Sequence, residues 1–547
     1  MKRVIPLVPA LLCACFLHAQ ETESAPRIVN IINFIRGVEP RTEVDLLEPV
    51  KKQIELARKY DLPSTFLLQY DALIRPEFVE LLKTQLGPDD EIGVWLEVVQ
   101  PQVEAAGMKW RGRFPWDWHT DVGFTIGYSP EERRRLVDVL MRKFKEVFGR
   151  YPKSVGCWLI DAPTLNYLAE KYGIVAACIC KDQSGTDGYT LWGGYWNQAY
   201  YPSRRNAFMP AQTAAGQVDV PVFRMLGSDP IDQYDTGIGA ERQGVITLEP
   251  VYPEAGGNPR WVGWFLEVNV HEPCLAFAYM QAGQENSFGW PAMEKGLQDQ
   301  YPRLAALRDE GEIRVETLAE SGEWFRKTFD RTPATAMVAL EDFEGRDRGG
   351  IWYESARYRL NLAFEGDSWR IRDIHRFDER YPERYLETRV ETNDAFYDTL
   401  PVVDGYNWSQ PGREPAGIRL VGVNPDGATR PWPTGKPRVE ETGRDSLRIT
   451  IPIKAGGEIR ISCDPGATRF DVENAPGSWA LEMRWSSGRT AITGTDPHAI
   501  RYEHNGFQYA AHFPDANVEP GTQPDSILIH PNAGSLTLEF EYGRKSP

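Results

Sequence analysis

The chain has 547 residues, of which 41% are hydrophobic and 25% are charged, with a formal net charge of −17. A chain of this length exceeds one ordinary domain, so we expect two or three domains, each with its own hydrophobic core. The acidic balance argues against nucleic acids and anionic membrane surfaces as partners, because both are bound by basic patches.

Residues 1–19 have the pattern of a secretory signal peptide. Two basic residues are followed by an apolar run, and Ala19 offers a small residue for cleavage. We therefore expect export to the periplasm or the cell exterior. Lipoprotein processing at Cys15 is a less favoured alternative, because the residues before it form a poor lipobox. No other segment approaches the roughly 18 apolar residues of a membrane-spanning helix.

Residues 27–335 alternate between strand-like and helix-like segments. The predicted strands are 27–35, 63–70, 91–98, 153–160, 175–180, 220–226, 244–250 and 274–280. Amphipathic stretches lie between them, such as 129–149, which begins with a Ser N-cap and carries acidic residues in its first turn. Helices alternating with continuously apolar strands predict a parallel sheet covered on both faces. Seven or eight strands favour an α/β fold with a distorted (β/α)7-8 barrel.

Two long insertions interrupt this alternation, over residues 98–128 and 181–219. Both are rich in Gly, Pro, Trp, Tyr and Asn. Loops of this length in a compact domain are usually functional. Because both follow the C-terminal ends of strands, we expect both to cover the same mouth of the barrel.

The pattern changes from about residue 336 onward. Segments that alternate with period two are joined by turns rich in Gly, Pro, Asn and Asp, which predicts antiparallel β-sandwich structure. A Pro-rich stretch near residue 440 suggests a division into a β-sandwich domain over 336–440 and a further β domain over 441–547.

Residues 154–174 join an apolar strand, Asp161 and an amphipathic helix. An acid at the C-terminal end of a barrel strand is a candidate catalytic group, because the chemistry of such barrels lies at that end. Capping of the following helix by Asp161 is the alternative interpretation, since Asp is a preferred N-cap residue.

This segment resembles the nucleophile strand of family-57 glycoside hydrolases. The matching residues are Gly156, Trp158, Leu159, Gly173 and Ile174. Asp161 stands where that family has Glu, although the related family-38 mannosidases use Asp. The broader superfamily includes polysaccharide deacetylases, and the resemblance implies an α/β barrel over residues 27–330. The layout is also similar to uncharacterised secreted bacterial proteins that join a barrel to β domains.

Two further acids are candidates for the partner of Asp161. Glu285 and Asn286 resemble the end of a late-strand Asp-Gly-Glu-Asn motif in family 57, in which the Asp is the general acid. Gly283 stands at the position of that Asp, so Glu285 would replace it. Glu249, which follows another apolar run, competes with Glu285 for this role. Glycoside hydrolysis needs one ionised and one protonated carboxyl group. A solvated loop position is the alternative for either Glu.

Polar and aromatic side chains expected near the mouth are candidates for substrate binding. Trp rings can stack on sugar faces, and packing in the core is the alternative for each of them. The candidates are Arg36, Glu39, Asp71, Trp95, Glu97, Trp118, His119, Trp192, Trp196, Arg224 and Asp229.

A metal-dependent deacetylase is disfavoured by the residues at the positions that matter. Deacetylases of the superfamily bind metal through an Asp and a His-x-x-x-His pair. In the segment that resembles their second motif, Trp95 and Val99 occupy the His positions, and residues 33–37 replace the acids of the first strand. No Gly-rich loop suits a phosphate or a dinucleotide. We therefore expect neither a metal nor a cofactor.

The sequence thus predicts a secreted glycoside hydrolase that uses two carboxylates at a barrel mouth on a neutral or cationic oligo- or polysaccharide. A retaining outcome is favoured. The alternatives are a non-catalytic carbohydrate-binding protein with a decayed barrel and a deacetylase-like enzyme.

Overall fold

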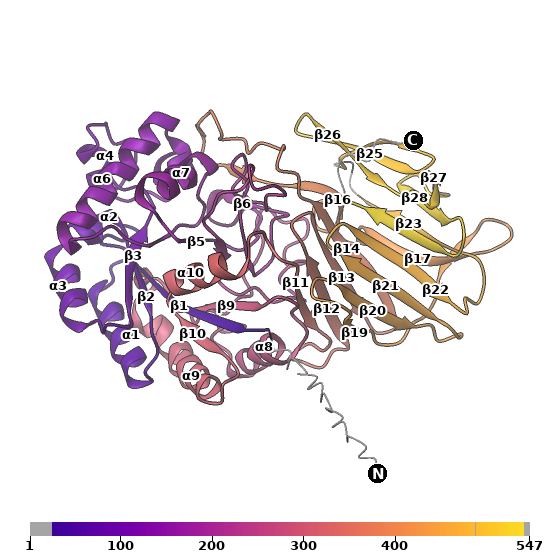
Figure 1. Cartoon of the computed structure of the whole chain (residues 1–547), viewed down its shortest axis with the longest axis horizontal. Helices are drawn as coiled ribbons and strands as arrows, with labels where there is room; N and C mark the ends of the chain where they lie inside the picture. Colours follow the sequence, from indigo (N-terminus) through magenta and orange to yellow (C-terminus); the bar gives the residue numbers. More distant parts are fainter. Residues whose placement is uncertain (1–24, 487, 489, 541–547) are drawn as a thin grey trace, which may run out of the picture.

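The computed structural model describes residues 25–486, 488 and 490–540. The expected signal peptide and the alternative site at Cys15 lie outside these residues. An α/β part and a β-sheet part lie next to each other along the long axis of the molecule (Figure 1). Within the described part of the chain, no helix is long and apolar enough to cross a membrane.

The α/β part is built on a nine-stranded sheet that curls into a nearly closed barrel. Its strands are β1 (Arg27–Ile35), β2 (Thr65–Leu68), β3 (Glu91–Trp95), β4 (Ser154–Gly156), β5 (Ala176–Ile179), β7 (Ala199–Tyr200), β8 (Val222–Arg224), β9 (Ala278–Ala282) and β10 (Arg314–Glu316). Strand β1 pairs in parallel with β2, β9 and β10, and β7 is antiparallel to β8. The predicted distorted barrel is confirmed.

The predicted strand over 244–250 is wrong. Thr247 makes only an isolated bridge with Ser228, and the backbone N–H of Leu248 donates to the carbonyl of Leu226. Pro250, at the C-terminal end of the segment, has no N–H to donate to a neighbouring strand, and a turn follows it. Strand β9 instead pairs with β1, and the segment is a loop.

Helices surround the barrel (Figure 1). They are α1 (Leu47–Lys59), α2 (Tyr70–Leu73), α3 (Pro76–Gln85), α4 (Gln100–Ala105), α5 (Thr120–Gly123), α6 (Pro130–Phe148), α7 (Ala162–Tyr167), α8 (Pro259–His271), α9 (Trp290–Asp309) and α10 (Leu318–Thr328). Ser129 caps α6 as predicted, in a capping box with Glu132. Helix α8 was not predicted, because apolar residues cover most of its circumference and no single face stands out in the sequence.

The C-terminal part consists of two large antiparallel sheets, which confirms the predicted β-sandwich structure. The ten-stranded sheet holds β11 (Thr335–Ala339), β12 (Arg348–Glu354), β13 (Tyr358–Glu365), β14 (Ser368–Arg376), β16 (Leu400–Asp404), β17 (Gly417–Val423), β18 (Thr429–Pro431), β23 (Trp479–Arg484), β27 (Ala516–Pro520) and β28 (Ser526–Pro531). The eight-stranded sheet holds β19 (Arg438–Glu441), β20 (Leu447–Pro452), β21 (Glu458–Asp464), β22 (Ala467–Glu473), β24 (Ile492–Asp496), β25 (Ala499–His504), β26 (Phe507–His512) and β29 (Ser535–Glu539). The ten-stranded sheet therefore takes strands from both sides of residue 440.

The insertion over 181–219 joins the two parts. Its strand β6 (Tyr189–Leu191) pairs with β15 (Ala395–Tyr397) from the C-terminal part. Trp196, also in the insertion, stacks on Trp352 of β12 with ring centroids 4.0 Å apart. Both rings are buried, so the two parts share a continuous core at this point.

We predict that Trp352→Ala lowers the free energy of unfolding by about 3 to 5 kcal/mol, the range for removing a buried aromatic ring from a packed core. The indole N–H of Trp352 also donates to the Pro230 carbonyl at 2.9 Å, so the change leaves that acceptor with only the hydrogen bond from Arg372. Urea denaturation measures the difference. Ile74→Ala, at a side chain that is 41% exposed, is the control and should change little.

Candidate active site

A cavity of about 490 Å³ lies where the carboxyl ends of β1, β3, β5 and β9 meet. We call this cavity the mouth. Its walls carry five carboxylates, three cationic side chains and seven aromatic rings. A concave site with convergent charged groups and aromatic walls is the usual form of a ligand-binding or active site. Both insertions contribute, as predicted, with Trp116 and Trp118 from the first and Tyr189 from the second.

Arg36 lies at the centre of the mouth, directly after β1. Its guanidinium binds Glu97 through two parallel contacts of 3.0 Å and Glu285 through one contact of 2.8 Å. All three side chains are buried. The ring of Trp116 covers the guanidinium with its centroid 4.1 Å away. One cation therefore holds two carboxylates from strands on opposite sides of β1.

Glu285 is placed by a glycine at the end of β9. Gly283 has φ +95°, and a Cβ there would lie 2.3 Å from the Ile32 carbonyl oxygen, so β9 can approach β1 only with glycine at this position. Oε1 of Glu285 accepts hydrogen bonds from Arg36 and Ser287. Oε2 is buried and has no hydrogen-bond partner among the described residues. Burial raises the pKa of Glu285, and the charge of Arg36 opposes that rise.

Glu249 reaches the mouth from the loop that follows β8. Its Oε2 accepts from the Thr247 hydroxyl at 2.8 Å, and its Oε1 accepts from the Gln284 amide at 3.2 Å. Burial raises the pKa of Glu249 from 4.5 to about 7, against the effect of these hydrogen bonds. Gln284 also accepts from the backbone N–H of Glu285 at 2.8 Å, so one side chain connects the two acids.

An aromatic and cationic wall faces these acids. The guanidinium of Arg41 lies 4.7 Å from the ring centroid of Trp116 and 5.5 Å from that of Trp118, and it also forms an ion pair with Glu39. Phe288, at the rim, is 42% exposed. Such rings provide flat surfaces on which a sugar ring can stack.

The structure places Asp161 away from the mouth, in the role of a helix cap. Its carboxylate accepts from the backbone N–H and the hydroxyl of Thr164, from the Thr125 hydroxyl, and from Arg133 at 3.0 Å. The side chain is fully buried, and it is not among the residues that line the mouth. Because these four contacts saturate both oxygens, the geometry favours the capping interpretation over the catalytic one.

Four of the substrate-binding candidates line the mouth, namely Arg36, Glu39, Glu97 and Trp118. Among the others, Trp95 is buried and helps to orient Glu97, because its indole N–H donates to the Glu97 carboxylate at 2.8 Å. Asp71 accepts from the backbone N–H groups of Gly37 and Ala72, and burial raises its pKa to about 6. His119 lies beside the ring of Trp118, with ring centroids 6.2 Å apart, and does not line the mouth.

The remaining four candidates are structural or face elsewhere. Arg224 is buried in an ion pair with Asp182 at 2.9 Å. Asp229 accepts from the indole N–H of Trp261 at 2.8 Å and caps the turn after it. Trp196 packs in the shared core, and Trp192 lines a different cavity. Their strand-end or Gly-rich context predicted exposure at the mouth, but nearby partners bury them.

Several mouth residues were not predicted. Among them are Arg41, Lys181, Tyr252 and Phe288. Lys181 comes directly after the predicted strand 175–180, so the rule that selected Glu97 also applies to it. Burial lowers the pKa of Lys181, and its ammonium donates to the Asp182 carbonyl at 3.1 Å.

The residues at the metal-binding positions of the deacetylases do not fit a metal ion. Trp95 uses its only polar atom as a donor to Glu97, and Val99 has no polar side-chain atom. Among the residues that the structure describes, no group of three or more His, Cys, Asp or Glu side chains could hold a metal.

We predict that Asp161→Asn chiefly destabilises the protein. It leaves the buried Arg133 without its charged partner, and breaking a buried ion pair in this way costs about 3 to 5 kcal/mol. Urea denaturation measures the loss, and folded Asp161→Asn should bind ligands at the mouth as the wild type does. Glu170→Gln, in the exposed ion pair with Arg204, is the matched control and should leave stability unchanged. A variant of unaltered stability that loses the function of the mouth would contradict this assignment.

No family model and no curated protein matches the chain. One solved structure from Parabacteroides distasonis, provisionally described as a glycoside hydrolase/deacetylase, aligns with a TM-score of 0.50 and 18% identity over 72% of this chain and 94% of its own. A provisionally described polysaccharide deacetylase from Mycobacterium smegmatis aligns with a TM-score of 0.34 and 11% identity, over 60% of this chain and 98% of its own. A family-57 branching enzyme from Thermococcus kodakaraensis aligns with a TM-score of 0.27 and 10% identity, over 56% and 71%. The chain therefore has a glycoside hydrolase/deacetylase-like fold, as the resemblance of residues 154–174 predicted.

Proposed function

We propose that the mouth hydrolyses glycosidic bonds, with Glu249 as the general acid and Glu285 as the ionised carboxylate. The observation that carries this proposal is the difference between their environments. Among the described residues Glu249 forms no ion pair, and burial raises its pKa to about 7 against the more distant charge of Lys181. Glu285 is ion-paired to Arg36, whose charge opposes the rise in pKa that burial causes. Two nearby acids whose protonation is separated by their surroundings are what glycoside hydrolysis requires.

The free oxygen of Glu285 supports its role as the nucleophile. Arg36 and Ser287 hold Oε1, which leaves Oε2 to attack the anomeric carbon. Glu249 would protonate the departing oxygen and then remove a proton from the water that releases the sugar. Glu97 is less suited to attack, because four donors from Arg36, Trp95 and Gln69 occupy its oxygens. These roles correspond to a retaining mechanism.

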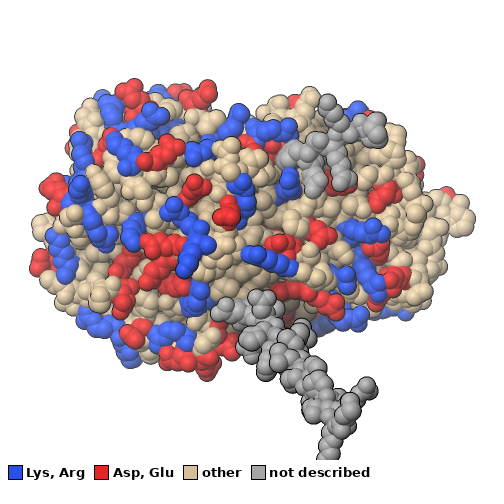
Figure 2. All heavy atoms as spheres, in the orientation of Figure 1, with Lys and Arg blue, Asp and Glu red and all other residues tan. Residues whose placement is uncertain are grey.

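The charge and aromatic content of the mouth support a neutral or cationic saccharide as the substrate. Its five carboxylates outnumber its three cations. Over the face shown in Figure 2, basic and acidic side chains are interspersed. The provisional description of the Parabacteroides distasonis structure as a glycoside hydrolase/deacetylase supports the carbohydrate class. Metal-dependent deacetylation is not proposed, because the residues at the metal positions do not fit. Export remains a prediction from residues 1–19.

We predict that Glu249→Gln and Glu285→Gln each lower kcat, by about 10² to 10⁴ for loss of the general acid and by at least as much for loss of the nucleophile. The assay is a panel of aryl glycosides and soluble glycans. Asp187→Asn, at an exposed acid on the same rim, is the matched control and should keep most activity. Glycan binding by a wild type that turns over no member of the panel would support a decayed barrel instead.

The pH dependence gives a second prediction. Because Glu249 must be protonated to donate, kcat should fall as pH rises through about 7, the pKa to which burial raises it. The free energy of unfolding should change in the same direction. Because the pKa of Glu249 is higher in the folded protein than the unfolded value of 4.5, its protonated form stabilises the fold at low pH, and this stabilisation is lost as pH rises through about 7. Glu249→Gln should therefore be more stable than wild type at pH 8, measured by thermal unfolding. An equal pH dependence in both proteins would contradict the assignment.

The stereochemical outcome tests the role of Glu285. We predict that proton NMR of the first product shows the anomeric configuration of the substrate retained. With Glu285→Gly, added azide should restore turnover and give a glycosyl azide of inverted configuration, because a small anion can take the place of the missing carboxylate. Inversion by the wild type would assign Glu285 as a base that activates water.

A further inference from the structure

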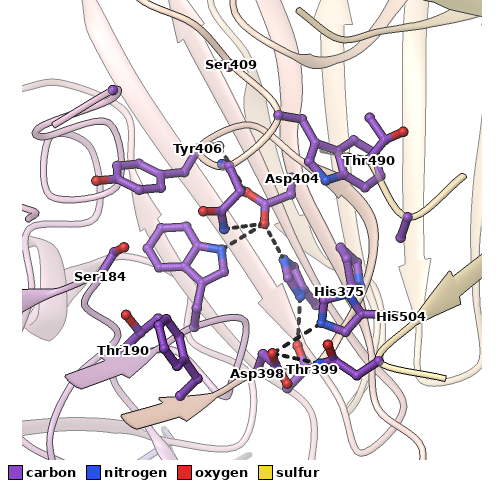
Figure 3. A pocket seen from close by; sticks show the side chains of 18 of the residues that line it. Ser184, Thr190, His375, Asp398, Thr399, Asp404, Tyr406, Ser409, Thr490 and His504 are labelled. Atoms are coloured by element: carbon purple, nitrogen blue, oxygen red, sulfur yellow. Dashed lines mark hydrogen bonds and ion pairs between the residues drawn. The ribbon is translucent and has the colours of Figure 1, made fainter. Parts of the chain in front are cut away.

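A second cavity of about 800 Å³ lies between the barrel and the sandwich. We call it the junction cavity. Its walls come from barrel loops at residues 184–192 and 239–241, from residues 375–411 of the first sheet region, and from residues 490–505. Figure 3 shows side chains from these segments converging on one space. The volume lies within the range of about 300 to 1,000 Å³ that is typical of ligand-binding sites.

One loop separates the junction cavity from the mouth. Gln183 and Tyr189 line the mouth, whereas Ser184 and Trp192 in the same loop line the junction cavity. The segment at residues 239–245 is divided in the same way between the two cavities. The two sites are therefore separate spaces on opposite sides of a common wall.

Hydrogen bonds within the protein fix the polar groups of the junction cavity. Asp404 accepts from the indole N–H of Trp192 at 3.0 Å and from the Asn407 amide at 2.8 Å. Asp398 is held by Arg384 at 2.6 Å and by the Asn505 amide at 3.1 Å. These contacts satisfy the carboxylates and orient the two amides, whose carbonyl oxygens can accept from ligand hydroxyls.

His375 adds a buried acceptor between these groups (Figure 3). The Thr399 hydroxyl donates to the Gly193 carbonyl at 2.6 Å, so Nδ1 of His375, 2.7 Å from the same hydroxyl oxygen, must donate. Burial lowers the pKa of His375 and keeps the ring neutral at neutral pH. Its Nε2 then carries a lone pair and has no hydrogen-bond partner among the described residues, and carboxylate oxygens of Asp373 and Asp404 lie 3.5 Å and 3.7 Å from it. This wall therefore favours a ligand that donates hydrogen bonds.

Aromatic rings complete the site. Trp192 and Tyr406 lie together in the wall, with ring centroids 4.7 Å apart. Phe396, in β15, is 42% exposed and lines the cavity. Rings beside fixed amides and carboxylates bind both the faces and the hydroxyl groups of sugars.

We propose that the junction cavity binds an uncharged oligosaccharide, as a glycan site separate from the mouth. The choice of a glycan rests on the proposed function. An anionic chain is disfavoured, because the cavity carries the carboxylates of Glu241, Asp398, Asp404 and Glu503 against a single arginine. The site would hold a segment of a long substrate while the mouth acts on another.

The test is isothermal titration of the full chain carrying Glu249→Gln, so that no ligand is consumed. The probes are cellohexaose, xylohexaose, maltohexaose, mannohexaose and chitohexaose, with hexagalacturonate as the anionic control. We expect at least one neutral hexaose to bind at two sites and hexagalacturonate not to bind at the junction cavity. Phe396→Ala should weaken one site at least tenfold and leave the other unchanged.

Phe288→Ala is the matched variant, because Phe288 has the same exposed fraction, 42%, at the rim of the mouth. Phe288→Ala should weaken binding only at the mouth and leave binding at the junction cavity unchanged. Asn407→Ala, at an exposed residue, should reproduce the effect of Phe396→Ala without loss of thermal stability. With Glu249 intact, Phe396→Ala should keep kcat on aryl glycosides and raise KM for the bound hexaose.

Failure of this proposal is distinguishable from failure of the proposed function. If no hexaose shows binding that depends on Phe396 and Asn407, the junction site is overturned, whatever the mouth does. If such binding is present but no glycan is hydrolysed, the junction site stands and the glycosidase assignment fails.

Discussion

The mouth depends on one buried cation between two carboxylates. Taking Arg36, Glu97 and Glu285 out of water costs several kcal/mol for each ion, and this cost is offset only when each group is fully hydrogen-bonded. Arg36 meets that condition through the two acids and Ser287, and Glu97 meets it through four donors, whereas Oε2 of Glu285 has no partner among the described residues. One negative charge nevertheless remains in excess. Burial is the main cause of the raised pKa of Glu249, and the charge of Glu285 adds to it, so the arrangement that holds Glu285 also favours the protonated form of Glu249.

Side chains of the C-terminal sheets help to hold the residues at the mouth of the barrel in place. Asp182, next to Lys181 of the mouth, binds Arg224 of β8 and Arg359 of β13. Arg359 in turn binds Asp373 of β14 at 2.8 Å, and the whole chain of charges is buried. A buried ion pair tolerates little displacement, because an unpaired charge there is costly. The position of Lys181 is therefore fixed partly by the C-terminal sheets.

The helices and strands were predictable because buried positions recur along them, which places apolar residues in the sequence at regular intervals or in continuous runs. Continuous apolar runs predicted the strands of the barrel, and the segment 129–149 predicted α6 with its cap. The pattern failed where the period was absent or interrupted. Helix α8 is apolar around most of its surface, and the apolar run 244–250 makes only an isolated bridge. In both cases the local sequence lacked the contrast between buried and exposed positions on which such predictions rely.

The site was predictable only as a set of strand-end residues. That rule selected Arg36, Glu97 and Glu285, which line the mouth, and it also selected Asp161, which does not. Nothing within residues 154–174 shows that Arg133 and Thr125, which lie earlier in the chain, contact this carboxylate. The partners of a buried acid come from tertiary contacts, which no local pattern encodes.

Hydrogen-bond capacity separates these acids more sharply than their position does. A carboxylate can accept about four hydrogen bonds. Asp161 and Glu97 each accept four from the protein, which suits anchoring groups. Glu285 and Glu249 each accept two. Both acids line the mouth. Their carboxylate oxygens can therefore accept further hydrogen bonds at a place that a substrate can reach.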